Sequence, residues 1–325
     1  MAIAIGSIPQ ARLAQRVRRQ RQLDDVFRWL TLGFALAVLL VLGGVIVALI
    51  KGAWPALSTF GFGFLTTEVW NPVTEKFGAL APIYGTLITS LVAMIIGIPI
   101  SFGIAVFLTE LAPPWLRRPV GIAVELLAGI PSIIYGIWGF FVFAPILQTS
   151  VQPFLIATFG HLPLIGALFK GPPYGIGMLT AGLILAIMVL PFITAIMREV
   201  FEQVPPLLKE SAYGLGATTS EVVWRVVLPA TRIGVVGGII LGLGRALGET
   251  MAVTFVIGNA HRVKASLLAP GTTISASIAN EFTEAVGDLY LSSLIALGLI
   301  LFAITFVVLA IAKFLLIRMK RRLGS

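Results

Sequence analysis

Long apolar segments alternate with short polar ones along the whole chain. Each apolar segment offers roughly 20 residues or more, which lets a helix cross about 30 Å of hydrocarbon at about 1.5 Å per residue. We therefore predict an all-α integral membrane protein with six transmembrane helices. These helices are expected at residues 29–50, 83–108, 119–147, 176–197, 233–258 and 290–317. A further apolar segment, 161–169, is too short to span and contains a proline, so we predict an external loop or a re-entrant turn there.

The composition agrees with a membrane protein. Hydrophobic residues make up 58% of the chain and charged residues only 11%, which is too apolar for an ordinary soluble domain of this length. The absence of cysteine excludes disulfides and thiolate chemistry. Its two histidines, His161 and His261, fall in separate predicted external loops and are expected to be solvated. Because they lack the spacing of metal ligands, we predict no metal site.

Basic residues are concentrated in four segments, which together hold 17 of the 23 lysines and arginines. These segments are the N-terminal arm, the connection between the second and third helices, the loop 198–232 and the C-terminal end. Six helices place all four on one side of the membrane, so the positive-inside rule predicts that both termini and this loop are cytoplasmic. Topology and anionic lipid headgroups account for the net charge of +9, so we predict no nucleic-acid partner.

The loop 198–232 has internal structure that the sequence reveals. Pro205 and Pro206 should break the preceding helix, and a short helix over 207–213 should end at a glycine elbow. Thr218 with Glu221 three residues later is a capping-box pattern for a second helix, which we expect Pro229 to end. The loop then presents a compact, partly apolar surface to the cytoplasm. A helical connection without a partner is the alternative.

This loop resembles the EAA loop of ABC-importer permeases, whose motif runs Glu-Ala-Ala, a glycine six residues after the glutamate, and Ile-x-Leu-Pro at the end. The matching residues are Glu210, Ala212, Gly216, Leu228 and Pro229. Ser211 and Val226 depart from the motif but are conservative in size. The resemblance implies the fold of a type I importer permease and docking of the loop into a groove on a separate ATPase.

The chain has no Gly-x-x-x-x-Gly-Lys-Ser/Thr phosphate loop with which to hold ATP. We therefore expect no enzyme activity and no cofactor in this chain, with ATP and Mg²⁺ bound by the partner ATPase.

Three charged residues within the predicted helices stand out, Glu125, Arg245 and Glu249. A charged side chain at this depth costs about 2.5–3.5 kcal/mol on insertion scales, so such residues are candidates for function. Arg245 and Glu249 are four residues apart and should pair on one helix face. An oxyanion could then compete for the guanidinium, whose planar fork matches phosphate oxygens. The alternative is an ion pair that locks two helices together.

The predicted third helix contains an interruption. Gly129 and Pro131 should leave backbone amides free, with the Ser132 hydroxyl at the start of the following half-helix. Half-helix N-termini at membrane depth favour anions. A proline kink without a ligand is the alternative. The predicted substrate-path residues are thus Arg245, Glu249, Ser132 and Glu125.

Three stretches together resemble the phosphate-specific ABC importer permeases: 125–132, 244–253 and the loop 210–229. The basic N-terminal arm and the stretches 77–86 and 107–111 are similar to the PstC branch of this family rather than the PstA branch. The resemblance implies that Arg245 and Glu249 act in phosphate translocation. It also implies a heterodimer with a PstA-like permease, a PstB-like ATPase dimer, a PstS-like phosphate-binding protein outside, and a place in the cell inner membrane.

Other functions remain open from the sequence. A permease for another oxyanion, such as phosphonate, sulfate or molybdate, or for a sugar would share the loop, and an ion channel or structural subunit would need no ATPase. The expected organisation is a basic cytoplasmic arm (1–28), a first transmembrane helix (29–50), an external segment (51–82), a permease core (83–317) that contains the coupling loop (198–232), and a basic cytoplasmic tail (318–325).

Overall fold

The computed structural model describes residues 10–163 and 165–323, and within those ranges the regular secondary structure is helical, apart from an isolated β-bridge between Asn71 and Lys76. The chain divides into two compact units, with the boundary between Gly52 and Ala53. The helix α1 (Gln10–Phe60) runs through this boundary without a break and includes the first predicted transmembrane segment.

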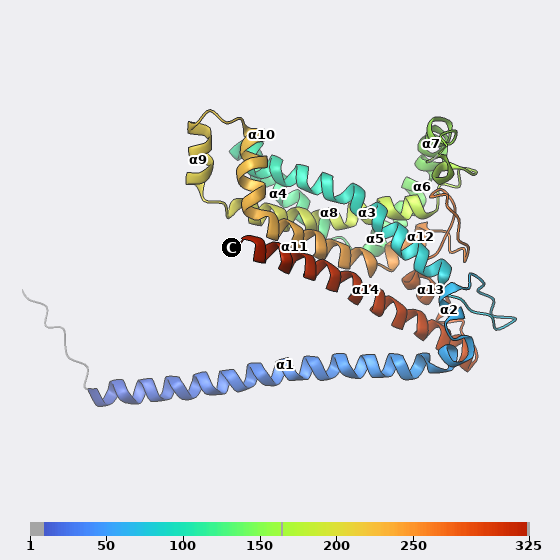
Figure 1. Ribbon diagram of the computed structural model, residues 1–325, viewed down its shortest axis with the longest axis horizontal. Coiled ribbons are helices and arrows are strands. Elements are labelled where there is room, and N and C mark those ends of the chain that lie inside the picture. Colours follow the sequence, from blue (N-terminus) through green and yellow to red (C-terminus); the bar gives the residue numbers. More distant parts are fainter. Residues whose placement is uncertain (1–9, 164, 324–325) are drawn as a thin grey trace, which may run out of the picture. The chain divides into compact units, whose positions relative to one another are not determined.

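The second unit contains the remaining helices (Figure 1). The first of these are α2 (Gly63–Thr66), α3 (Leu80–Val106), η1 (Phe107–Leu111), α4 (Pro114–Ala128), α5 (Ser132–Trp138), η2 (Gly139–Phe143), α6 (Ala144–Ile146), η3 (Leu147–Val151) and α7 (Gln152–Phe159). They are followed by η4 (Gly166–Phe169), α8 (Met178–Glu202), α9 (Pro206–Gly214), α10 (Thr219–Val222), η5 (Val223–Val227), α11 (Leu228–Leu247), α12 (Met251–Val256), α13 (Ile274–Glu281) and α14 (Asp288–Leu323).

The prediction of six membrane-spanning helices is confirmed by length and composition within the described residues. The six candidates are Leu23–Phe60, Leu80–Leu111, Ser132–Phe159, Met178–Glu202, Thr219–Leu247 and Asp288–Met319. Several of them join consecutive labelled elements, because π-helical turns such as η2, η3 and η5 continue a helix at a wider pitch.

The predicted bounds of the third helix, 119–147, are wrong. Gly129 ends α4, and Pro131, which has no N–H to continue the hydrogen-bond ladder, precedes a new helix at Ser132. The spanning helix continues to Phe159, past the polar residues that follow Leu147 in the sequence. Glu125 therefore lies in α4, outside the six candidate spans.

The predicted bounds of the fifth helix, 233–258, are also wrong, and so is the prediction that Pro229 ends the preceding helix. Pro229 occupies the first turn of α11, where proline is tolerated, and the wide turn η5 precedes it directly. The helix instead ends at Leu247, and Gly248 separates it from the short helix α12.

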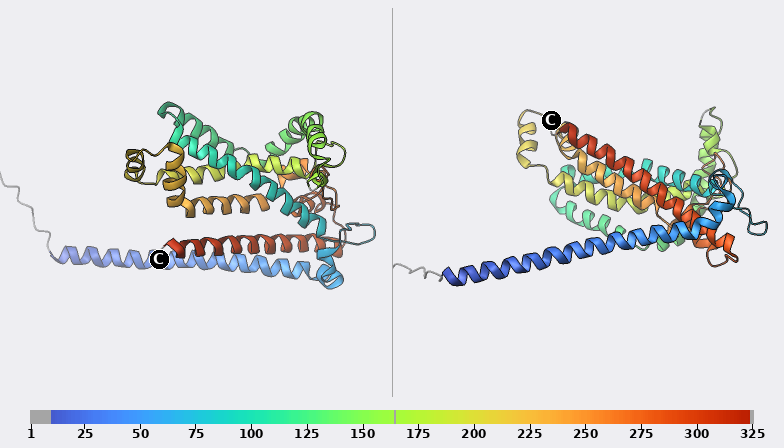
Figure 2. Two further views of the ribbon diagram at one scale, coloured as in Figure 1. Left: turned by 45° about the horizontal axis from the view of Figure 1, so that its top comes forward. Right: turned by 60° about the horizontal axis from the view of Figure 1, so that its bottom comes forward.

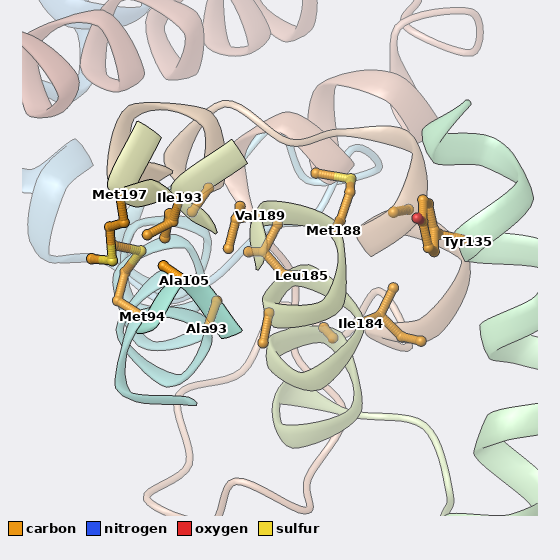
Figure 3. Close-up of a cluster of buried hydrophobic side chains, with 14 of the residues drawn as sticks. Ala93, Met94, Ala105, Tyr135, Ile184, Leu185, Met188, Val189, Ile193 and Met197 are labelled. Atoms are coloured by element: carbon orange, nitrogen blue, oxygen red, sulfur yellow. The ribbon is translucent and has the colours of Figure 1, made fainter. Parts of the chain in front are cut away.

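The packed centre of the second unit is formed mainly by α3 and α8, which contact each other along most of their lengths. Small residues permit this close approach: Gly97 faces Val189 and Ala186, and Gly182 faces Val92. Larger side chains fill the surrounding space (Figure 3). They include Met94, Leu185, Met188, Ile193 and Met197, all nearly or fully buried. The pair thus forms a close-packed scaffold for the helices around it.

The two ends of the second unit carry different elements (Figure 1). The loop helices α9 and α10 lie at the same end as the C-terminal part of α14, whereas α2, α7 and α13 lie at the opposite end. Helix α14 runs beside α11 in both views of Figure 2. The loop 198–232 and the C-terminal end therefore share one side, and the assignment of that side to the cytoplasm stays a prediction.

Replacing Gly85 with alanine is expected to destabilise the fold, because the added methyl group would overlap the backbone carbonyl of Thr272. Overpacking of this kind costs about 1–3 kcal/mol, so the melting temperature of the purified protein should fall. Gly103→Ala is the matched control, since this glycine lies on the same helix and a methyl group there would have no neighbour within 4 Å. Equal melting temperatures for the two variants would contradict the close contact.

Candidate functional site

Arg245 lies in the last turn of α11, next to the break at Gly248. The Cζ atom of its guanidinium is 4.1 Å from the centroid of the Phe192 ring on α8, a cation–π geometry. Its Nε atom is buried and has no hydrogen-bond partner, and among the described residues no carboxylate forms an ion pair with it. The structure therefore leaves a partly buried cation without a counter-charge.

The predicted ion pair between Arg245 and Glu249 is wrong, because the helix ends between them. Glu249 falls in the break, and its Oε1 atom accepts a hydrogen bond of 3.2 Å from the backbone N–H of Ala252 at the start of α12. A carboxylate near a helix N-terminus is favoured by the unpaired N–H groups there. Glu249 thus satisfies α12 instead of neutralising the guanidinium.

The interruption predicted between Gly129 and Ser132 is present and separates α4 from α5. The Tyr135 hydroxyl spans it by donating a 2.8 Å hydrogen bond to the carbonyl of Leu127. Ser132 begins α5 and its hydroxyl makes no hydrogen bond to the described residues.

Helix α5 lies close to the arginine. A side chain at Gly136 would meet the backbone of α12, so α5 packs directly on that helix, and the Tyr135 hydroxyl lies within electrostatic range of Arg245. Two interrupted helices are therefore brought together near this cation.

Glu125 belongs to a different cluster. It forms a 3.0 Å ion pair with Arg198 of α8, and Arg198 also contacts Glu202 at 3.4 Å. A pocket of about 430 Å³ lies there, and Arg117 and Arg118 complete its charged lining. The structure thus joins Arg245 with α5 and α12, and it places Glu125 at a contact between α4 and α8.

The loop 198–232 has the predicted helix, elbow and helix. Gly216 has a φ of +86°, which favours glycine, and it lies two residues after the end of α9. The capping box is present, with the Glu221 N–H donating to the Thr218 side chain and the Thr218 N–H to the Glu221 carboxylate. This rigid geometry fixes the direction in which α9 projects.

The EAA-like residues are divided between two faces of this loop. Ala212 and Leu228 pack against the main core, whereas Pro229 and Glu210 are exposed. Large apolar side chains are also exposed on and beside α9, among them Leu207 at 71% and Leu215 at 91%. An apolar surface on a polar loop is typical of a protein interface.

Sequence reasoning missed a buried ion pair that holds this loop. The Nζ atom of Lys209 on α9 is 2.6 Å from Oε1 of Glu110 on η1, and the two side chains are 18% and 5% exposed. The separation of 99 residues in sequence gave no signal of the contact.

Sequence reasoning also missed a polar cluster at the end of the second unit opposite to α9. His261, expected to be solvated, lies 2.8 Å from Glu281 and stacks on the Trp70 ring. Trp70 and Tyr290 also donate hydrogen bonds to Glu281. Burial raises the pKa of the Glu281 carboxyl, but the hydrogen bonds from His261, Tyr290 and Trp70 outweigh it and hold that pKa below its usual range. This cluster joins the segment after α2 to α13 and α14.

Comparison with solved structures shows the fold class. A bacterial alginate ABC transporter, in complex with an alginate-bound periplasmic protein, is 18% identical, has a TM-score of 0.59 and aligns over 92% of this chain and 97% of that one. The methionine ABC transporter MetNI, in an inward-facing conformation, has a TM-score of 0.55 at 18% identity and aligns over 72% and 93%. The fold is therefore that of an ABC importer permease.

Comparison of sequences shows the family. Residues 97–321 match the family described as binding-protein-dependent transport system inner membrane component. The phosphate transport system permease protein PstC of Mesorhizobium japonicum is 67% identical and aligns over 95% of this chain and 94% of its own. The proteins of the same name from Pasteurella multocida and, as a probable one, Methanocaldococcus jannaschii are 62% and 39% identical, over 93% and 89% of this chain. The chain therefore belongs to the binding-protein-dependent inner-membrane transport components, and within them to the PstC phosphate transport system permease family.

Proposed function

We propose that this protein is the membrane permease subunit of an ATP-driven importer of inorganic phosphate in the cell inner membrane. It forms the translocation path with a second, PstA-like permease and works with a PstB-like ATPase dimer and a PstS-like phosphate-binding protein. Membership of the PstC family supports the cargo. The observation that carries the role of this chain is the partly buried Arg245, which forms no ion pair with a carboxylate of the described residues.

Arg245 is suited to hold an oxyanion in transit. A membrane-embedded arginine costs about 2.5–3.5 kcal/mol and is retained where a counter-charge or a substrate offsets that cost. Because Glu249 caps α12, the guanidinium has its fork of donors available for phosphate oxygens. Aromatic contact with Phe192 orients the side chain without competing for those donors. A single arginine also permits release, which a cluster of uncompensated arginines would oppose.

The break at Gly248 places an interrupted helix beside this residue. Helix α11 ends at Leu247, two residues after Arg245, and α12 packs on α5 across the Gly136 contact. Interrupted helices of this kind form anion sites in transporters. We infer that phosphate meets Arg245 near the α11–α12 break, with polar help from Ser132 and nearby amides of α5.

The loop 198–232 is the proposed coupling element, and it lies on the cytoplasmic side together with both termini. Glu210, Leu207 and Leu215 form the surface that would enter a groove on the ATPase, which binds ATP and Mg²⁺. Closure of the ATPase dimer would then push the loop and reverse access to the path.

Uptake of radiolabelled phosphate tests the cargo. Phosphate-starved cells that lack their own high-affinity system and express this chain with its partner subunits should accumulate phosphate, and excess unlabelled phosphate should compete. Sulfate, molybdate and phosphonate should compete at least about tenfold more weakly, which corresponds to a difference of about 1.4 kcal/mol in binding free energy. Preferential competition by one of these other anions would identify a different cargo for the same permease.

A further inference from the structure

The end of α3 contacts both helical segments, or limbs, of the coupling loop: α9 is one limb, and α10 with η5 is the other. On one limb, Lys209 of α9 forms the 2.6 Å ion pair with Glu110, which lies on η1 directly after α3. On the other limb, the Trp224 ring of η5 lies 5.6 Å from the Phe102 ring of α3. Phe102 also packs edge-on against Phe201 near the end of α8, at 5.8 Å. The loop is thus fastened to the same pair of helices that forms the core.

Helix α9 divides its residues between two faces. Lys209 and Ala212, three residues apart, point into the protein, where Ala212 packs on the core and Lys209 reaches Glu110. Leu207, Leu208 and Glu210 are exposed. One face is therefore available for a partner while the other is bound to η1 and α8.

The ion pair resists separation more strongly than an apolar contact would. Its carboxylate is 5% exposed, so moving Lys209 away would leave a buried charge uncompensated, which is strongly unfavourable. The ammonium also donates to the carbonyl of Phe201 at the end of α8, where a helix terminus favours a cation. A charge-assisted hydrogen bond of this kind is also shorter and stronger than a neutral one.

We propose that Glu110 and Lys209 are positioning residues for energy coupling: their ion pair makes α3 and α8 follow the movement of α9. The inference rests on the proposed function, because it assumes that an ATPase moves α9. It assigns a role to the stretch 107–111, which lies outside the EAA-like motif and outside the surroundings of Arg245. The ATPase would bind the exposed face of α9, and the buried face would pull the scaffold that carries Phe192 beside Arg245.

The test compares the amount of phosphate transported per ATP hydrolysed in the complete importer reconstituted in vesicles. In Glu110→Gln and Lys209→Gln, this ratio should fall about tenfold or more, within the usual range for coupling between two sites. The ATPase should still copurify, because Leu207 and Glu210 are unchanged. The charge-reversed double variant, Glu110→Lys with Lys209→Glu, should recover most of the ratio.

Glu202→Gln is the matched control. It removes a carboxylate from an exposed ion pair at the same end of α8, where the Glu202 side chain is 54% exposed, so the ratio should not change. Wild-type ratios in both single variants would overturn the proposal that this ion pair makes α3 and α8 follow α9. The proposal would also be overturned if the ratio stayed low both in the charge-reversed double variant and in the cross-linked variant described next.

A cross-linking experiment covers the case in which the single variants fail to assemble. The chain has no cysteine, so Glu110→Cys with Lys209→Cys creates one reactive pair when the partner subunits are also cysteine-free. A short, reducible, thiol-specific cross-linker should restore coupled transport, and a reducing agent should abolish it. Equal ratios of phosphate transported to ATP hydrolysed before and after reduction would overturn the proposed role of the ion pair. Absence of uptake by the wild type would instead count against phosphate import, and the two failures are therefore distinguishable.

Discussion

Arg245→Ala is expected to reduce phosphate uptake by about 10- to 100-fold, because a hydrogen bond to a charged group contributes about 1.5–3 kcal/mol. The guanidinium is partly buried beside Phe192, and no carboxylate among the described residues forms an ion pair with it. Arg245→Lys should retain a fraction of the uptake, since an ammonium keeps the charge but loses the bidentate fork. The measurement is the initial rate of radiolabelled uptake at equal levels of assembled complex.

Two controls separate this role from a structural one. Arg232→Ala changes an arginine on the same helix, 13 residues earlier and also with an unpartnered buried Nε atom, and it should keep most of the uptake. Glu249→Gln keeps an acceptor for the Ala252 N–H and should also transport, because the structure gives Glu249 no contact with Arg245. Normal uptake by Arg245→Ala would refute the proposed role of this residue, and a loss in Glu249→Gln as large as that in Arg245→Ala would restore the pairing hypothesis.

Leu207→Asp is expected to detach the ATPase subunit and to abolish uptake with it. Leu207 is 71% exposed at the start of α9, and truncating an apolar anchor at the centre of an interface costs about 2 kcal/mol or more, which corresponds to about 30-fold in affinity. An aspartate there adds the cost of desolvating a charge. The measurement is the amount of ATPase that copurifies with the permease, together with uptake. Glu210→Ala should weaken both in the same direction.

Val286→Asp is the matched control for Leu207→Asp. Val286 is 87% exposed in the connection between α13 and α14, at the end of the unit opposite to α9. The same change in chemistry should therefore leave the ATPase bound. Copurification of the ATPase with Leu207→Asp at the wild-type level would show that α9 is not the docking surface.

Most of the coupling loop was predictable because its signals are local, although Pro229 lies in the first turn of α11 and does not end the preceding helix as we expected. Two adjacent prolines stop α8, a glycine that adopts a positive φ forms the elbow, and a capping box starts the next helix. Each signal depends on residues within three or four positions of one another, so the three-dimensional context does not override it. The number of membrane spans was predictable for a similar reason, since each contains an apolar segment of sufficient length, but the bounds of the third and fifth spans were not.

The pairing of Arg245 with Glu249 was not predictable from spacing. Four residues apart, they would share a face of an unbroken helix, but Gly248 ends α11 between them and Glu249 caps α12. Glycine inside an apolar segment is compatible with a continuous helix and with a break, and packing of α12 on α5 and α8 accompanies the break here. The sequence identified the charged residues but not their partners.

Chain order and composition specify the membrane class, the number of spans and the local form of the loop, because hydrophobic length and capping act over a few neighbouring residues. The contacts between Glu110 and Lys209, between Arg245 and Phe192, and between His261 and Glu281 exist only once distant helices have packed. Small residues at the helix interfaces set how close those helices come. The charge environment of each site follows from that approach, and for this reason the tertiary structure alone decided which charged residues are paired and left Arg245 without a carboxylate partner among the described residues.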